Sequence, residues 1–133
     1  MEGEYTILLV EDEAPAVLAI DGYLSHAGFT VIKCFSAQEG LKAALEHHPS
    51  LIILDIMMPA GSGLDMLPEL RNDPWGKTAK VLIFSNLADT EYKATADKYY
   101  VDKCLVKTDT TLKELETSIS QLVPVGVPSA QKR

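Results

Sequence analysis

The sequence predicts an α/β protein with one doubly wound, five-stranded parallel sheet and helices on both faces. Short apolar runs of strand length alternate with segments in which apolar residues recur at helical spacing. The run at 51–54, Leu-Ile-Ile-Leu, is apolar throughout, which is typical of a strand buried on both faces of a parallel sheet. It ends in Asp55, and a proline and two glycines in the next segment then force a loop. Strands and helices that alternate in this way define the α/β class.

Local signals mark where the helices between the strands begin and end. Pro15 opens the first helix, because proline is favoured at the first helical position, and Gly28 is expected to end it. Ser36 and Thr111 each begin a capping box, since a glutamate follows three residues later. Pro68 should kink the third helix or delay its start. Right-handed crossovers then give a (βα)5 arrangement of the flavodoxin-like kind. The predicted strands span 6–10, 29–35, 51–54, 81–84 and 104–106, and the predicted helices centre on 15–27, 36–48, 64–70, 90–99 and 111–122.

Length and composition fit one folded domain. The chain has 133 residues, of which 47% are hydrophobic and 23% charged, so a single core needs no disulfide to support it. Cys34 and Cys104 lack a metal-binding pattern and are expected to be free thiols. We expect a folded domain over 1–122. Residues 123–133 are predicted to be a disordered tail, because they have no apolar periodicity and contain two prolines and a glycine.

Charge and hydropathy exclude two classes of partner. The net charge of −7 argues against a nucleic-acid surface, which needs a basic patch. No apolar run reaches the ~18 residues of a membrane span, and the polar start does not resemble a signal peptide. We therefore expect no membrane insertion and a cytoplasmic location.

The predicted strands bring reactive groups to one place. The carboxyl ends of parallel strands lie at the same edge of the sheet, where open α/β sheets bind ligands. Clustered carboxylates repel one another and favour a hard divalent cation such as Mg²⁺. A carboxylate nucleophile beside such a cation and an ammonium group is what phosphoryl transfer requires. A surface acid cluster with an unrelated lysine is the alternative. The strand-end residues are Glu11, Asp12, Asp55, Ser85 and Lys107.

These residues and their neighbours resemble the receiver domain of two-component response regulators. The resemblance runs from about residue 5 to residue 122. Each motif alone is weak, but the set occurs in the right order and at the right spacing. The motifs are Val10-Glu11-Asp12-Glu13, Leu54-Asp55-Ile56-Met57-Met58-Pro59 with Gly63, the strand-end Ser85, and Val106-Lys107.

The resemblance implies a function and a role for each site residue. Asp55 would accept a phosphoryl group from a sensor histidine kinase or a phosphotransfer protein. Ser85 and Lys107 would hold the phosphoryl oxygens, and movement of Ser85 would drive the switch toward a downstream protein target. With few residues after 122, we expect output by protein–protein contact or a phosphorelay, and no activity as an enzyme beyond self-phosphorylation from small donors and self-dephosphorylation. The implied Mg²⁺ ligands are Asp12, Asp55 and the Met57 backbone carbonyl, with Glu11 helping through a water molecule.

Three positions depart from the pattern of the family. The residue after the strand-end serine is usually small, whereas here it is Asn86, which predicts a crowded site. The residue after the lysine is usually proline, whereas here it is Thr108. Cys104 occupies a position that is usually aromatic, and Tyr99 or Tyr100 is expected to take the place of the missing ring.

Other functions fit the sequence less well. A phosphorylation-independent interaction module on the same fold is the main alternative, although it would not need the complete set of acids, serine and lysine. A phosphatase with an aspartyl nucleophile would want a general acid two residues after Asp55, and Met57 cannot donate a proton. A flavin-binding domain would want a phosphate-binding loop after the first strand, where the acids at 11–13 would repel phosphate.

Overall fold

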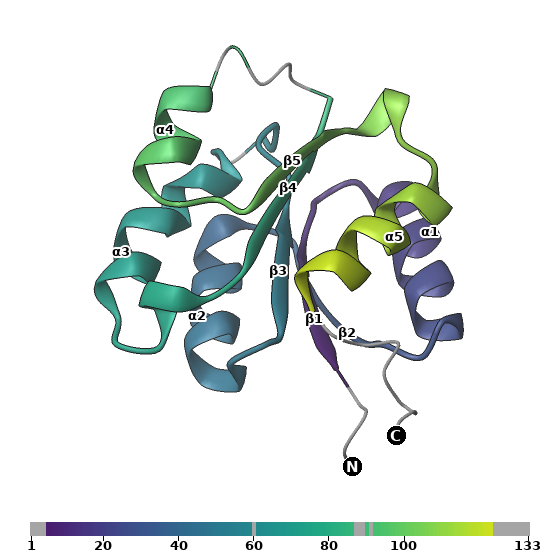
Figure 1. Cartoon of the computed structure of the whole chain (residues 1–133), viewed down its shortest axis with the longest axis horizontal. Helices are drawn as coiled ribbons and strands as arrows, with labels where there is room; N and C mark the ends of the chain where they lie inside the picture. Colours follow the sequence, from purple (N-terminus) through teal and green to yellow (C-terminus); the bar gives the residue numbers. More distant parts are fainter. Residues whose placement is uncertain (1–4, 60, 87–89, 91, 124–133) are drawn as a thin grey trace.

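The computed structural model describes residues 5–59, 61–86, 90 and 92–123, and it confirms the predicted fold class. Within these residues, five parallel strands form one sheet in the order β2-β1-β3-β4-β5 (Figure 1). The strands are β1 (Thr6–Val10), β2 (Thr30–Cys34), β3 (Leu51–Leu54), β4 (Val81–Ser85) and β5 (Lys103–Val106).

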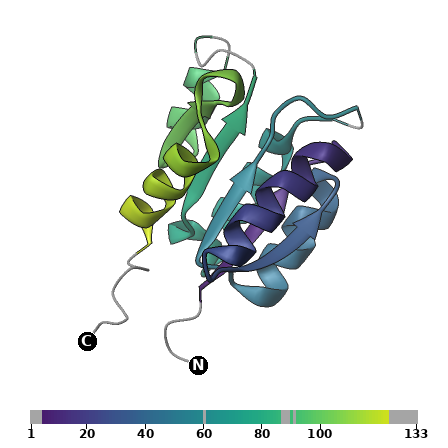
Figure 2. The same ribbon diagram turned by 90° about the vertical axis from the view of Figure 1, so that its right-hand side faces the viewer.

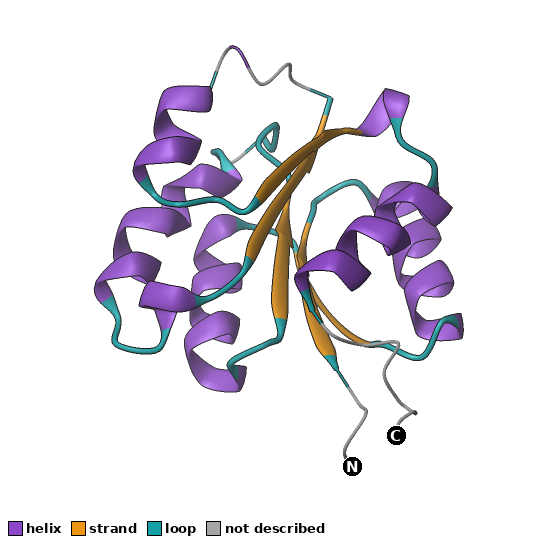
Figure 3. Ribbon diagram, in the orientation of Figure 1, coloured by secondary structure: helices purple, strands orange, loops and turns teal. Residues whose placement is uncertain are grey.

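Helices cover both faces of the sheet (Figure 3). The helices α1 (Ala14–His26) and α5 (Leu112–Leu122) pack on one face and lie toward the viewer in Figure 2. The helices α2 (Ala37–His47), α3 (Leu67–Asn72) and α4 (Lys93–Lys98) pack on the other face. Short 3-10 turns add η1 (Gly63–Met66), η2 (Gly76–Thr78) and η4 (Lys107–Asp109).

The strands supply two apolar cores because successive side chains point to opposite faces of a sheet. In β3, Leu51 and Ile53 pack in the core under α1 and α5, while Ile52 and Leu54 pack in the core under α2, α3 and α4. All four side chains are at most 1% exposed. A strand buried on both faces in this way is a fixed support for the residue that follows it, which is Asp55.

The strand order reverses its direction between β1 and β3. Both neighbours of β1 are paired in parallel, with Val10 beside Cys34 on one side and beside Leu54 on the other. The chain leaves β1 toward β2 and leaves β3 toward β4, so the two crossovers diverge above this pair of strands. Ligands of open α/β sheets bind at such a switch point, outside the carboxyl ends of the strands.

The predicted helix signals hold, with one difference in detail. Thr111 forms a complete capping box with Glu114, as predicted. Ser36 accepts a hydrogen bond from the Glu39 N–H, but the Glu39 carboxylate reaches one residue further back and accepts from the Phe35 N–H at 2.9 Å. The second half of that capping box is therefore displaced by one residue.

The third helix starts late, as its proline predicts. The segment begins as the 3-10 turn η1 and becomes α-helical only at Leu67, with Pro68 in the first turn of α3, where its missing N–H costs no hydrogen bond. Among the other elements, β2 is one residue shorter at each end than predicted, β5 begins one residue earlier, and α4 is confined to Lys93–Lys98. These differences lie within the ordinary uncertainty of element ends.

The two tyrosines before β5 have different environments. Tyr99 is partly buried and packs against the core under α2, α3 and α4. Tyr100 has a left-handed backbone, with φ of 57°, and its side chain is 76% exposed. In this structure the Tyr100 ring lies in solvent, and that Tyr99 or Tyr100 takes the place of the missing aromatic ring stays a prediction.

The end of the described chain is well packed. Val123, the first residue of the predicted tail, is buried in the core under α1 and α5, and its N–H donates to the Ile119 carbonyl at 2.9 Å. The rest of the predicted tail, 124–133, lies outside the described residues. In the part of the chain that the structure describes, no helix has the length and apolar character needed to cross a membrane.

Candidate functional site

The acidic residues of the site are held by backbone bonds that continue the sheet. The Glu11 N–H donates to the Cys34 carbonyl and the Asp55 N–H donates to the Val10 carbonyl, each at 3.0 Å. Both residues follow directly after their strands, β1 and β3, on either side of the switch point. Their backbones are consequently fixed as firmly as the sheet itself.

A lysine that directly follows β5 neutralises two of these carboxylates. The Lys107 ammonium donates to Asp55 Oδ2 at 3.1 Å and also to Glu11 Oε1. Glu11 is 1% exposed and Asp55 is 5% exposed, so neither charge has water as its main partner. A buried carboxylate is tolerated only when it is paired and hydrogen-bonded, and Lys107 supplies both conditions.

The remaining carboxylate oxygens are oriented by the backbone. Asp55 Oδ1 accepts from the Met57 N–H at 3.2 Å, and Glu11 Oε2 accepts from the Glu13 N–H at 3.1 Å. Each acid therefore presents one oxygen to a backbone donor and the other to the Lys107 ammonium. This arrangement sets the direction of both carboxylates before any ligand arrives.

The pKa values of Glu11 and Lys107 are both shifted upward, for opposite reasons. Burial raises the pKa of Glu11 because it penalises the charged carboxylate, and the hydrogen bond from Lys107 opposes this shift. Burial lowers the pKa of Lys107, but the hydrogen bonds to Glu11 and Asp55 and the charges of these acids outweigh it, so the net pKa is raised. The lysine is consequently cationic at neutral pH.

The site offers a set of oxygen ligands of the kind that hard cations prefer. Glu11, Asp12 and Asp55 each place a carboxylate oxygen so that the three lie within 4.8 Å of one another. Oxygen-only donor sets suit Mg²⁺ or Ca²⁺ rather than zinc or copper. In this structure the Lys107 ammonium supplies the positive charge beside Glu11 and Asp55, so a divalent cation would compete with it for these two carboxylates. The Met57 carbonyl remains a prediction, and the Met57 side chain is exposed.

The serine and asparagine at the end of β4 lie at the same sheet edge. Ser85 is completely buried at the last position of the strand, opposite Val106 of β5. Asn86 Oδ1 accepts a hydrogen bond from the Thr108 N–H at 3.1 Å. That Asn86 crowds the site stays a prediction. Thr108 can donate because it has an N–H that the usual proline lacks, but its pairing with Asn86 also requires that η4 lie beside the end of β4.

The loop after β3 depends on a glycine that approaches Asp55 closely. The Gly63 N–H donates to the Asp55 carbonyl at 3.1 Å, and a Cβ on Gly63 would lie 2.2 Å from that carbonyl oxygen. Contact this short with backbone cannot be relieved by a side-chain rotation. Any larger residue at 63 must therefore displace either η1 or Asp55.

We expect Gly63→Ala to lower the free energy of unfolding by about 1–3 kcal/mol, the usual cost of overpacking. Gly22→Ala is the matched control, because Gly22 lies inside α1 with nothing within 4 Å of the added methyl group. That change should stabilise the protein by roughly 0.5–1 kcal/mol through helix propensity. Urea denaturation of both variants measures the difference, and equal effects would show that the close approach is unimportant.

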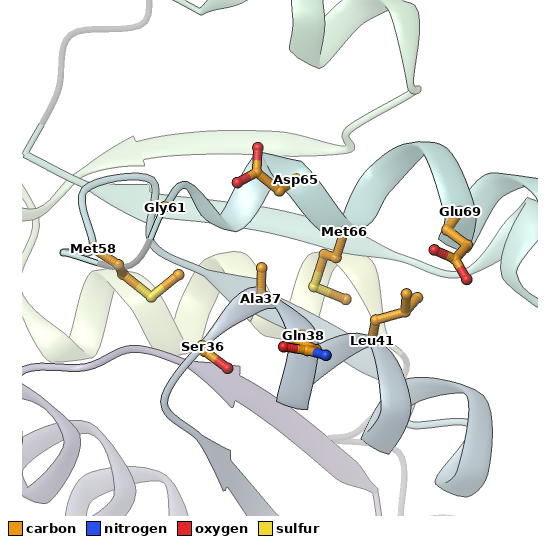
Figure 4. Close-up of a pocket in the computed structure, with 9 residues that line it drawn as sticks. All are labelled: Ser36, Ala37, Gln38, Leu41, Met58, Gly61, Asp65, Met66 and Glu69. Atoms are coloured by element: carbon orange, nitrogen blue, oxygen red, sulfur yellow. The ribbon is translucent and has the colours of Figure 1, made fainter.

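A separate pocket of about 310 Å³ lies between α2 and the segment formed by η1 and α3 (Figure 4). Its lining combines methionine and leucine side chains with two acids. None of the three clustered carboxylates belongs to it, so it is not part of the site at the strand ends. The lining residues are Ser36, Ala37, Gln38, Leu41, Met58, Gly61, Asp65, Met66 and Glu69.

A doubly wound sheet with paired acids at its switch point and a lysine directly after the fifth strand is the architecture of a receiver. The family model of the response regulator receiver domain matches residues 7–120. The chain therefore belongs to the response regulator receiver domain family.

Relatives and solved structures agree with this assignment. The response regulator ArlR of Staphylococcus aureus is 33% identical over 101 residues, which cover 76% of this chain but only 45% of ArlR. The chain thus spans about half the length of the curated relatives it matches. The chemotaxis protein CheY4 of Vibrio cholerae has the same fold, with a TM-score of 0.83 at 21% identity over 90% of this chain and 99% of CheY4. The response regulator TrrA of Thermotoga maritima, solved in complex with Mg²⁺-BeF, has a TM-score of 0.77 at 27% identity over 90% and 99% of the two chains.

Proposed function

We propose that the chain is a phosphorylation-dependent signalling switch with Asp55 as its phosphoacceptor. The observation that carries this proposal is the Asp55 carboxylate itself, buried at the switch point and held between the Lys107 ammonium and a backbone N–H. Membership of the receiver family and the Mg²⁺-BeF complex of TrrA support it. The cognate donor would be a phosphohistidine on a sensor kinase or a phosphotransfer protein.

The reaction transfers one phosphoryl group between two side chains. A carboxylate oxygen of Asp55 forms a bond to phosphorus while the phosphorus–nitrogen bond of the phosphohistidine breaks. The imidazole nitrogen keeps the electron pair and then takes a proton. The Lys107 ammonium, already beside Asp55, would compensate the charge on the transferring oxygens, and the Ser85 hydroxyl would donate to one of them.

A divalent cation completes the charge balance of this reaction. When bound, Mg²⁺ supplies positive charge to the phosphoryl oxygens. Asp12 and Asp55 would hold it directly and Glu11 would assist, in keeping with the spacing of their oxygens. The protein's own contribution is to fix these acids on the sheet and to keep Lys107 charged.

The output proposed for the switch is contact with a downstream protein or onward transfer in a phosphorelay. Acceptance and loss of the phosphoryl group are then the only chemistry, and the chain does not turn over a separate substrate. The proposed compartment is the cytoplasm, where phosphohistidine donors would reach the site. The alternative is an interaction module that works without phosphorylation.

Beryllofluoride separates these two functions, because it imitates a phosphoryl group on an aspartate without a covalent transfer. In the presence of Mg²⁺ we expect wild-type protein to bind it and to show amide shifts around Asp55, Ser85 and Lys107. Asp55→Asn should show none of these shifts. A wild-type spectrum that does not change with beryllofluoride and Mg²⁺ would favour the phosphorylation-independent module.

A metal-dependence prediction follows from the carboxylate cluster. Asp12→Ala should leave the metal-free protein as stable as wild type or more stable, because one of three repelling charges is removed. Wild type should gain ~2.7 kcal/mol at a Mg²⁺ concentration a hundredfold above the dissociation constant, whereas the variant should gain little. Glu13→Ala is the control, since Glu13 is exposed and outside the cluster. Thermal melts decide the question, and an equal shift in Asp12→Ala would count against the site.

A further inference from the structure

One hydrogen bond joins Asn86 and Thr108, the residues that come after the serine and the lysine of the site. Asn86 comes directly after Ser85, and Thr108 comes directly after Lys107. Asn86 Oδ1 accepts from the Thr108 N–H at 3.1 Å. The last paired residues of β4 and β5 are Ser85 and Val106, so this contact lies beyond the end of their ladder. It ties the two strands together where their backbones would otherwise separate into loops.

The bond completes a set of contacts around the backbone of Lys107. The Thr110 hydroxyl donates to the Val106 carbonyl at 2.8 Å, and the Thr110 N–H donates to the Lys107 carbonyl at 3.3 Å. Both of these contacts come from Thr110, the residue that directly follows η4. Beyond the last ladder pair, Ser85 and Val106, the bond from Asn86 links this group of contacts to the end of β4. The Asn86 amide therefore helps to set the position of η4 relative to β4.

The direction of the lysine side chain depends on that backbone. Lys107 must reach across β4 to the acids that follow β1 and β3, since β5 is the edge strand of the sheet. Its ammonium meets two carboxylates from two different strands at once. A long side chain loses much rotamer freedom when it is held in one such geometry. A fixed backbone at Lys107 reduces the number of side-chain arrangements that compete with the one that reaches both carboxylates.

We propose that Asn86 is a positioning residue, which fixes the backbone around Lys107 through the Thr108 N–H so that the ammonium reaches both Glu11 and Asp55. Asn86 itself contacts neither acid in this role. The two departures from the family pattern, at 86 and 108, are thus one interaction. The part of this inference that concerns a phosphoryl mimic rests on the proposed function, whereas the part that concerns the resting ion pairs does not.

The first test uses metal affinity, which needs no phosphorylation. Lys107 and Mg²⁺ compete for Asp55 and Glu11. Asn86→Ala should hold Lys107 less firmly against these acids and so tighten Mg²⁺ binding by about fivefold, which corresponds to the loss of one ordinary hydrogen bond. Thr108→Pro removes the donor and should act in the same direction, while Thr108→Ala keeps the N–H and should have no effect. Asn86→Asp keeps an acceptor oxygen and should leave the amide exchange rate of Thr108 unchanged, whereas Asn86→Ala should quicken it.

A double-mutant cycle with Lys107→Ala distinguishes positioning from a general structural role. In the Lys107→Ala background, Asn86→Ala should change Mg²⁺ affinity no further, because the group that it positions is gone. The same fold-change with and without Lys107 would overturn the proposal. So would Mg²⁺ affinities that Asn86→Ala and Thr108→Pro leave at the wild-type value.

Beryllofluoride then tests the loaded state separately. With saturating Mg²⁺, Asn86→Ala should weaken beryllofluoride binding by about fivefold, opposite in sign to its effect on the metal. If wild type does not bind beryllofluoride, the proposed function fails, and the Mg²⁺ cycle still decides the role of Asn86. If wild type binds it and Asn86→Ala binds it equally well while the Mg²⁺ cycle is additive, only the positioning role fails.

Discussion

Lys107→Ala is expected to lower the free energy of unfolding of the metal-free protein by about 3 kcal/mol at neutral pH, the scale on which buried ion pairs fail when one partner is removed. The change leaves Glu11 and Asp55 buried and side by side without their shared cation. Mg²⁺ should recover most of the loss, because it places positive charge among the same oxygens. Lys113→Ala, on the exposed surface of α5, is the control and should change stability by less than about 0.5 kcal/mol.

The pH dependence of this loss has a definite sign. Burial already raises the pKa of Glu11, and without the opposing hydrogen bond from Lys107 that pKa should rise further. A carboxyl with a higher pKa in the folded chain binds its proton more tightly there, so its folded state is favoured at low pH and penalised as the pH rises through the folded pKa. The deficit of Lys107→Ala should therefore be small near about pH 4 and largest at neutral pH. Urea denaturation across this range measures it, and a deficit that grows on acidification would contradict the account.

Arg71→Ala is expected to lower the free energy of unfolding by roughly 3 kcal/mol, since charged hydrogen bonds are strong and several partly buried carbonyls lose their donor. The Arg71 side chain leaves the end of α3 and reaches two separate segments of backbone. Its guanidinium donates to the carbonyls of Gly76 and Ala79 beside η2, and to those of Tyr99 and Tyr100 before β5. The distances range from 2.7 to 3.0 Å.

A planar fork with several donors is essential for this arrangement. Arg71→Lys keeps the charge but cannot reach both segments, so it should recover only a minor part of the stability. Lys77→Ala, at an exposed neighbouring position, should be close to neutral. Amide exchange should quicken at Tyr100, the left-handed residue whose carbonyl accepts from Arg71, and at Val101, which follows it. If Arg71→Ala and Lys77→Ala have equal stability, the guanidinium is not an anchor.

The fold and the cluster of acids were predictable because each has a local signal. The apolar run of β3 and the loop-forming residues after it place Asp55 at a strand end whatever the partner strands do. Parallel strands then bring the ends of β1 and β5 to the same edge, which is why Glu11, Asp12 and Lys107 could be assigned to one site. The capping boxes and Pro68 likewise act over a few residues.

Contacts between distant loops had no such signal. The reach of Arg71 to Tyr99 and Tyr100 depends on how the loop before β5 packs against α3, and the spacing in the sequence does not encode it. The exposure of Tyr100 depends on one left-handed residue, which sequence patterns rarely indicate for tyrosine. The bond between Asn86 and Thr108 required the relative position of β4 and η4. These features depend on how segments far apart in the sequence pack against one another.

The central claim is that Asp55 accepts a phosphoryl group in a metal-dependent reaction, and covalent labelling tests it most directly. Wild-type protein is incubated with acetyl phosphate and Mg²⁺ beside a receiver known to accept this donor, and intact mass and peptide mapping locate the product. We predict one phosphoryl group per chain on the peptide that contains Asp55, with none in Asp55→Asn and none when EDTA removes the metal. Equal labelling of Asp55→Asn, or no labelling of wild type while the reference receiver is modified, would contradict the account.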